Sequence, residues 1–132
     1  MIVFEAIRRW FSPRELRDVG ETPDYRFSLA NERTFLAWLR TGLALVGGGL
    51  AVAQLLPALP VTYLREALAI ALLVLGGTVA VHAVHHWTRT ERAIRLNQEL
   101  PASRFPALLS LAVGLGAALL VAAVLTQAVR QP

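Results

Sequence analysis

Three long stretches almost free of charge constrain this chain more than any other feature. They lie at about 34–56, 67–86 and 106–129. Each has about the 20 apolar residues that a helix needs to cross the hydrocarbon of a bilayer. A soluble three-helix bundle would give each helix a polar face, but the second stretch has one hydroxyl, Thr78, and the third has only Ser110 before Thr126. The sequence therefore predicts an all-α, integral membrane bundle of three spanning helices.

The predicted helices divide the chain into two parts. Residues 1–27 form an N-terminal segment, in which residues 2–11 combine apolar and charged side chains like a short amphipathic helix at a membrane surface. Residues 28–132 form the membrane domain. Ser28 is expected to cap a first helix that begins directly after it, and Ser103 to cap the third, because serine hydroxyls accept hydrogen bonds from a first helical turn.

The arginines are divided unequally between the two sides of the predicted membrane. Ten precede the first stretch or follow the second, and two lie on the other side. The ten are Arg8, Arg9, Arg14, Arg17, Arg26, Arg33, Arg89, Arg92, Arg95 and Arg104, and the two are Arg65 and Arg130. Because cytoplasmic connections carry the excess of basic residues, we expect the N-terminus in the cytoplasm and the C-terminus outside.

Two arginines enter the first apolar stretch along one side of its helix. At about 100° per residue, they share that side with small or polar residues only. This arginine line comprises Arg33, Ala37, Arg40, Ala44, Gly47, Ala51 and Gln54. Small residues allow close helix approach, and polar residues in the same line avoid lipid, so we expect it to face protein or a water-filled space. Alternatively, Arg40 extends to lipid phosphates. Glu32 would pair with an arginine of a neighbouring helix or subunit, or remain in water.

The chain's three histidines end the second stretch. His82 and His86 are four residues apart, a spacing that can chelate zinc or copper. The chain has no cysteine, however, and Glu91 is the only nearby carboxylate. We therefore expect no metal and interpret both histidines, with His85, as interfacial residues beside Trp87, while a proton-sensing role stays open.

A basic ridge follows these histidines if the helix continues beyond the membrane. Arg89, Arg92 and Arg95 recur every three residues there. Together with Arg33 and Arg40 they form the predicted anion-binding group, because guanidinium groups bind phosphate with paired hydrogen bonds. Anionic lipid heads would satisfy the same group.

Small residues recur on all three stretches at four-residue spacing and predict close helix packing within or between subunits. The most regular set is Ser110, Gly114, Ala118 and Ala122. Three helices enclose little volume, so a site of useful size would need several copies of the chain. We expect no enzyme and no cofactor, since no nucleophile and base lie together in the sequence. The net charge is only +4, and the basic residues flank the apolar spans. This arrangement favours membrane lipids over nucleic acid as the anionic partner.

The segment "LANERTFLAWLRT", Leu29 to Thr41, closely resembles the opening of the YidH-type bacterial inner-membrane proteins, the family of domain of unknown function 202. The residues that carry the resemblance are Asn31, Glu32, Arg33, Thr34, Trp38 and Arg40. The resemblance extends over the three-span pattern and its basic segment after the second span. It implies a multi-pass protein of the cell's inner membrane.

The same domain is distantly similar to the membrane part of the vacuolar transporter chaperone complex. That resemblance implies a polyanion path lined by basic residues of several subunits, at positions that match Arg33, Arg40 and, with a looser alignment, Arg89. These 132 residues contain no polyphosphate-polymerising or sensor domain, so polymer synthesis is not implied. We expect a homo-oligomeric conduit or transport accessory for phosphate or polyphosphate. The alternative is a non-transporting scaffold or regulatory subunit that binds anionic lipid or a partner protein.

Overall fold

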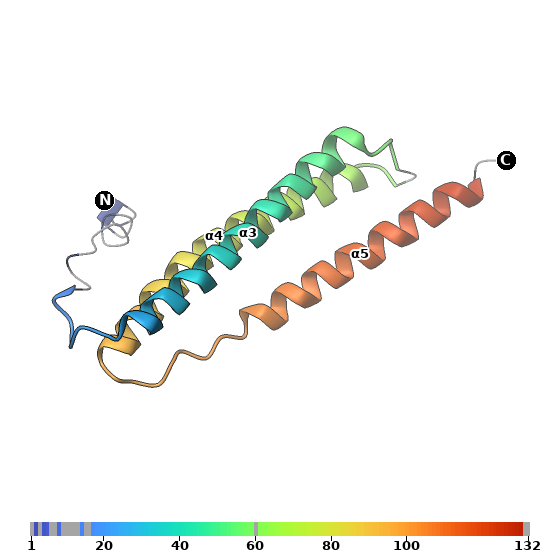
Figure 1. The fold of residues 1–132 in the computed structure, drawn as a ribbon. Coiled ribbons are helices and arrows are strands. Elements are labelled where there is room, and N and C mark those ends of the chain that lie inside the picture. Colours follow the sequence, from blue (N-terminus) through green and yellow to red (C-terminus); the bar gives the residue numbers. More distant parts are fainter. Residues whose placement is uncertain are drawn as a thin grey trace. The chain divides into compact units, whose positions relative to one another are not determined.

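The computed structural model describes residues 2, 4, 5, 8, 14, 17–59 and 61–130, which contain three long helices and no strand (Figure 1). Helix α3 spans Tyr25–Leu55, α4 spans Leu64–Arg95 and α5 spans Phe105–Arg130. All three are long and apolar enough to cross a membrane. The predicted all-α fold with three spanning helices is therefore confirmed. The expected amphipathic helix at 2–11 falls mostly outside the described residues, and the orientation of the termini stays a prediction.

Helix α3 begins one turn earlier than predicted, so the assignment of Ser28 as its cap is wrong. The carboxylate Oδ1 of Asp24 accepts a hydrogen bond from the N–H of Arg26 at 3.0 Å, and the Asp24 carbonyl accepts one from the N–H of Phe27 at 3.1 Å. Aspartate caps a helix as well as serine does, and Asp24 comes first in the chain. Ser28 therefore lies inside the helix, where its hydroxyl is free for another contact.

Helix α4 continues beyond the predicted second span as far as Arg95, so the predicted basic ridge lies on a helix. The helix ends in a Schellman motif. Asn97 has a φ of 51°, in the left-handed region that asparagine tolerates. The N–H of Gln98 donates to the carbonyl of Ala93 at 2.9 Å, and the N–H of Asn97 donates to that of Ile94 at 3.3 Å. These bonds satisfy two of the carbonyls that a helix end leaves without a partner.

A third carbonyl of this helix end is satisfied by the segment that precedes α3. The N–H of Glu21 donates to the carbonyl of Arg95 at 3.2 Å. Beside it, Gly20 has a φ of 66°, and a Cβ at this position would collide with the Arg95 carbonyl. Only glycine combines this backbone conformation with so close an approach. The chain before α3 is thus tied to the end of α4.

Helix α5 begins with the predicted cap, because the Ser103 Oγ accepts a hydrogen bond from the N–H of Phe105 at 3.2 Å. Within this single chain, Ala123 is the α5 residue that is buried. Large apolar side chains such as Leu108, Leu115 and Leu119 are more than half exposed. A surface of this kind is covered in the cell by lipid or by another protein.

The chain divides into two compact units, of which the first comprises Met1–Leu43 and Gly77–Ala102. In this unit the N-terminal part of α3 lies beside the C-terminal part of α4 (Figure 1). Aromatic residues fill the seam between them. The rings of Phe35 and Trp87 have centroids 6.3 Å apart, and Trp38 meets His82 edge to face at 5.3 Å. Ring pairs in these arrangements stabilise a contact beyond the apolar area that they bury.

The second unit comprises Ala44–Gly76 and Ser103–Pro132. Here the C-terminal part of α3 approaches the N-terminal part of α4 so closely that a Cβ on Gly49 would lie 3.0 Å from both the Ala69 carbonyl and Leu73 Cγ. Small residues therefore do bring helices together, as the sequence predicts, although Gly49 and Ala69 are not among the residues singled out for that role.

Candidate functional site

A buried carboxylate lies at the centre of the contact between α3 and α4 in the first unit. The side chain of Glu91 is 9% exposed. Its oxygens accept hydrogen bonds from the Ser28 hydroxyl at 3.1 and 3.4 Å and from Asn31 Nδ2 at 3.5 Å. The Nε of Arg95, one turn further along α4, is 3.4 Å from Oε1. We call these four residues the Glu91 node.

Asn31 connects the two helices of the node at two points. It is 5% exposed, and its Nδ2 donates to the Trp87 carbonyl at 3.1 Å as well as to Glu91. An amide nitrogen carries two N–H groups, so a single side chain can serve a carbonyl and a carboxylate together. Buried polar groups in folded proteins nearly always have such partners. The asparagine of the sequence motif is therefore a structural link between α3 and α4.

The charge of Glu91 is balanced within the chain by Arg95. Both side chains are largely buried, at 9% and 14% exposure. Removing two charges from water costs several kcal/mol per ion, and their attraction repays it only when further hydrogen bonds complete the site. Ser28 and Asn31 supply such bonds to Glu91, while the Arg95 Nε lies near Glu91 Oε1 without a hydrogen bond to any residue that the structure describes. Such a pair adds little net stability but strongly penalises any arrangement that separates its members.

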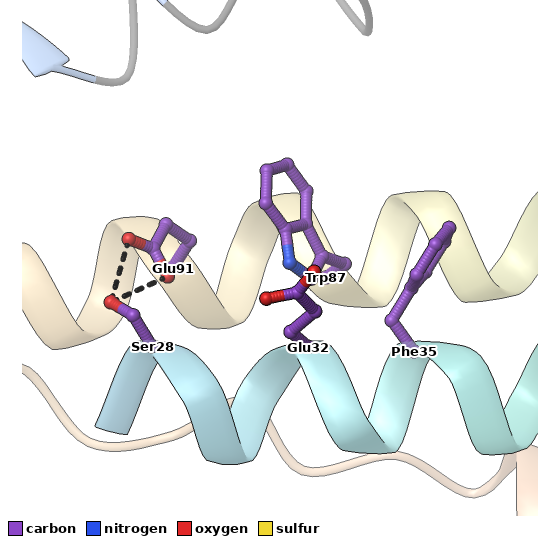
Figure 2. Close-up of a pocket in the computed structure, with 5 residues that line it drawn as sticks. All are labelled: Ser28, Glu32, Phe35, Trp87 and Glu91. Atoms are coloured by element: carbon purple, nitrogen blue, oxygen red, sulfur yellow. Dashed lines mark hydrogen bonds between the residues drawn. The ribbon is translucent and has the colours of Figure 1, made fainter. Parts of the chain in front are cut away.

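A shallow pocket of about 260 Å³ opens beside the node. It is lined by Ser28, Glu32, Phe35, Trp87 and Glu91 (Figure 2). The figure shows three of these side chains rising from successive turns of α3 towards α4, with the Ser28 hydroxyl directed at the Glu91 carboxylate. Glu32 is exposed, and it forms no ion pair with any residue that the structure describes. We call this hollow the Glu32 pocket.

A second hollow, of about 300 Å³, is also bounded by both helices and by the loop after α4. Its lining is mostly apolar and includes Phe27, Ile94, Leu100 and Pro101. Thr90 Oγ1 and His86 Nδ1 are 3.5 Å apart within it. None of its lining residues is an Asp, Glu or Arg, so this hollow offers no charged group to a ligand.

Four of the five predicted anion-binding arginines are exposed: Arg33, Arg40, Arg89 and Arg92. Across the described part of the chain none of the four forms an ion pair. Arg95 differs, because Glu91 already holds it. All five belong to the first unit, but no contact joins them into one collar within a single chain. Their role in anion binding stays a prediction.

The arginine line occupies the side of α3 that faces away from α4. Arg40 follows the buried Asn31 by nine residues, which at about 100° per residue places it about 180° around the helix. Every residue of the line is exposed in the single chain: Arg33, Ala37, Arg40, Ala44, Gly47, Ala51 and Gln54. The intrachain contacts of α3 therefore leave this side uncovered.

The remaining motif residues have separate surroundings. The Thr34 hydroxyl donates to the Ala30 carbonyl at 3.1 Å within its own helix. Trp38 packs on His82, whose ring lies 5.7 Å from that of His86, while His85 is exposed. In the residues that the structure describes, no group of three or more His, Cys, Asp or Glu side chains is placed to hold a metal ion.

Sequence reasoning missed the Glu91 node. It treated Glu91 only as a carboxylate near the histidines and Ser28 only as a cap. Ser28 and Glu91 are 63 residues apart, and neither has a local pattern that predicts the other. One local signal was present: Glu91 and Arg95 are four apart on a helix, the spacing at which opposite charges meet.

Comparison with known proteins places these features in context. Residues 26–93 match the family model described as a domain of unknown function, DUF202. The inner membrane protein YidH of Escherichia coli (strain K12) is 45% identical over 93 residues, which cover 70% of this chain and 81% of that protein. The uncharacterized protein Rv2272 of Mycobacterium tuberculosis (strain H37Rv) is 44% identical over 93 residues, covering 70% and 75%. No solved structure matches the chain.

Proposed function

The chain belongs to the DUF202 family, and we propose that it works in the cell's inner membrane as an oligomeric conduit, or transport accessory, for phosphate-rich anions. Three helices able to span a bilayer and a relative named as an inner membrane protein support the location. The proposal assigns no catalytic activity to the protein.

The observation that carries the proposal is the position of the arginine line. Arg33 and Arg40 lie on the side of α3 opposite the contact with α4, and both are exposed. Placing an arginine in contact with acyl chains is costly, so this side is suited to a neighbouring subunit or to water. Arginine presents a planar set of donors that fits phosphate oxygens in pairs. Several copies with this side turned inward would surround a path for phosphate-rich anions.

The need for several copies follows from the size of the hollows in one chain. The two pockets beside the node measure about 260 and 300 Å³ and are open at the surface. Neither is a passage through the membrane. Pores for anions are commonly lined by rings of basic side chains, and a ring requires the same arginine from each of several subunits.

Anion flux into liposomes tests the proposal. The purified protein is reconstituted, and uptake of phosphate and of short polyphosphate is compared with that of Arg40→Ala and Arg104→Ala. Arg104 is also exposed but lies outside the arginine line. We expect Arg40→Ala to reduce flux at least tenfold and Arg104→Ala to leave it within twofold. Equal flux in the wild type and Arg40→Ala, or no flux in any of the three, would contradict the proposal.

The second candidate function is a non-transporting scaffold or regulatory subunit. The observation that favours it is the end of α4, where Arg89 and Arg92 are exposed and without an ion pair in the described part of the chain. Lipid phosphates at a membrane surface would bind such groups. Copurification of a larger partner, together with retained binding to anionic vesicles and absent flux, would favour this function over the first.

A further inference from the structure

We propose that the Glu32 pocket is one half of a contact between two copies of this chain, and that it receives the guanidinium of Arg89 from the second copy. The inference rests on the proposed assembly in several copies and names the residues that form its subunit contact. It concerns the first unit alone, in which both the pocket and Arg89 lie.

The pocket has the chemistry that a guanidinium group requires. Glu32 supplies a carboxylate without an ion pair in the described chain, whereas the charge of Glu91 is already balanced by Arg95. The rings of Phe35 and Trp87 form the adjoining walls. A guanidinium can bond a carboxylate through two parallel N–H groups and stack its plane on an aromatic face at the same time. All thirteen cationic side chains of this protein are arginines.

None of the arginines that the structure describes lines the pocket. Arg33 and Arg40 lie on the side of α3 turned away from α4. On α4, Trp87 and Glu91 are one turn apart and face the pocket. Arg89 is two residues from each of them, which places it about 200° around the helix from both. It therefore emerges on the opposite side of α4 and reaches the pocket only from another molecule.

The pocket and Arg89 lie at the same level of the helix. Copies inserted by the same distribution of basic residues have the same orientation, so residues at equal depth meet. Arg89 lies between Trp87 and Glu91 in the sequence, within about 3 Å of either along the axis at 1.5 Å per residue. Arg40 is five residues beyond Phe35, about 7.5 Å further along α3. Of the two, Arg89 matches the level of the pocket.

A contact between two different sides of a subunit is head-to-tail, and such contacts close into a ring when the rotation allows. The arginine line occupies a further side of α3, away from α4, and stays available for the axis of that ring. The inference removes Arg89 from the predicted anion-binding group. Arg95 is already paired with Glu91. Three arginines of that group therefore stay available for anions: Arg33, Arg40 and Arg92.

Cysteine cross-linking tests the contact, because the natural sequence contains no cysteine. The double variant Glu32→Cys with Arg89→Cys is treated in native membranes with a short bis-methanethiosulfonate, since a Glu–Arg pair holds its backbones further apart than a disulfide permits. We expect a ladder of dimers and larger species. Each single variant should stay monomeric, as should a control in which Glu32→Cys is combined with Val81→Cys, an exposed position about 12 Å from Arg89 along α4.

Charge reversal provides a second measurement that does not depend on the reagent. Glu32→Arg alone and Arg89→Glu alone each place like charges together, and we expect either to lower the oligomer fraction in native mass spectrometry about tenfold. The double reversal restores the attraction and should return the fraction to within twofold of the wild type. Failure of the double variant to recover, while both single variants insert normally, would overturn the inference.

The outcomes separate this inference from the proposed function. Dimers from either single cysteine variant would indicate a two-fold contact and overturn it, and so would the absence of a ladder from the double variant. If flux depends on Arg40 but no cross-linked ladder forms, the conduit proposal holds and the subunits meet through another interface. If the ladder forms but no anion flux is measured, the interface is supported and the conduit proposal is contradicted.

Discussion

The two units hold α3 and α4 together by different means. In the first unit the helices meet through Asn31 and Glu91, whose hydrogen bonds cross the seam. In the second unit the helix backbones meet at Gly49 and Ala69, with no side chain of α3 between them. Hydrogen bonds are directional, so the first contact sets how each helix is rotated about its own axis. Small residues set only how near the helices come.

This difference bears on the direction in which the arginines of α3 point. The contact that fixes the rotation of α3 lies in the same unit as Arg33 and Arg40. With Asn31 held against α4, Arg40 is held about 180° away. A contact of small residues alone would tolerate rotation of α3 and would present the arginines in no fixed direction. Three substitutions test this contrast, from the largest expected effect to the smallest.

Glu91→Ala should have the largest effect. It leaves the Arg95 side chain, which is 14% exposed, without its carboxylate, and breaking one partner of a buried ion pair costs about 3 kcal/mol. The free energy of unfolding in mixed micelles, measured by titration with SDS, gives this value. Glu91→Gln keeps one acceptor oxygen for Ser28 or Asn31, so its free energy of unfolding should fall between that of Glu91→Ala and that of the wild type.

The matched control for this substitution is Glu99→Ala, at an exposed glutamate beyond the end of α4. We expect a change below about 0.5 kcal/mol, as is usual for surface positions. Equal stability of Glu91→Ala and Glu99→Ala would show that the Glu91 node does not hold the helices together.

Gly49→Leu tests the second unit. Its side chain would begin 3.0 Å from the Ala69 carbonyl and Leu73, so the helices must separate, at a cost of about 2 kcal/mol for overpacking. Gly48→Leu is the control, because a Cβ there meets nothing within 4 Å and the residue lies outside the arginine line. The same unfolding titration should leave Gly48→Leu as stable as the wild type or more so. An equal decrease in the free energy of unfolding in the two variants would contradict the close approach of the helices at Gly49.

Ser28→Ala should have the smallest effect of the three. It removes one donor to Glu91, while Asn31 and Arg95 remain, and polar side-chain contacts between membrane helices average about 0.6 kcal/mol. Ser110→Ala is the comparison, because the Ser110 hydroxyl donates to the Pro106 carbonyl within its own helix, α5. A larger loss for Ser110→Ala than for Ser28→Ala would contradict the assignment of Ser28 to the node.

Features that depend on a long apolar stretch or on helical spacing could be predicted from the sequence. The three helices follow from their apolar length, and the Ser103 cap follows from local chemistry. The common side of the arginine line also follows from helix geometry, and the structure shows that α4 does not cover it. That the line faces protein or water stays a prediction. Each of these features depends on residues within a few turns of one another, for which helix geometry alone gives the relation.

Features that depend on two distant segments could not be predicted in the same way. The partner of Ser28 is 63 residues away, and that of Asn31 is 60. A buried Glu91 resembles any solvated glutamate in the sequence "RTERAIR" until α3 is placed beside it. The start of α3 was placed too late because two good capping residues, Asp24 and Ser28, stand one turn apart, and helix propensity does not choose between them.

The long separation within the node has a consequence for synthesis of the protein. The ribosome completes Asn31 well before it reaches Glu91, so α3 leaves the exit tunnel with an amide that has no matching acceptor. Until α4 follows, that part of the nascent helix is better solvated at the membrane surface than in the hydrocarbon. The paired helices would therefore settle into the bilayer as a unit, after the second of them has been translated.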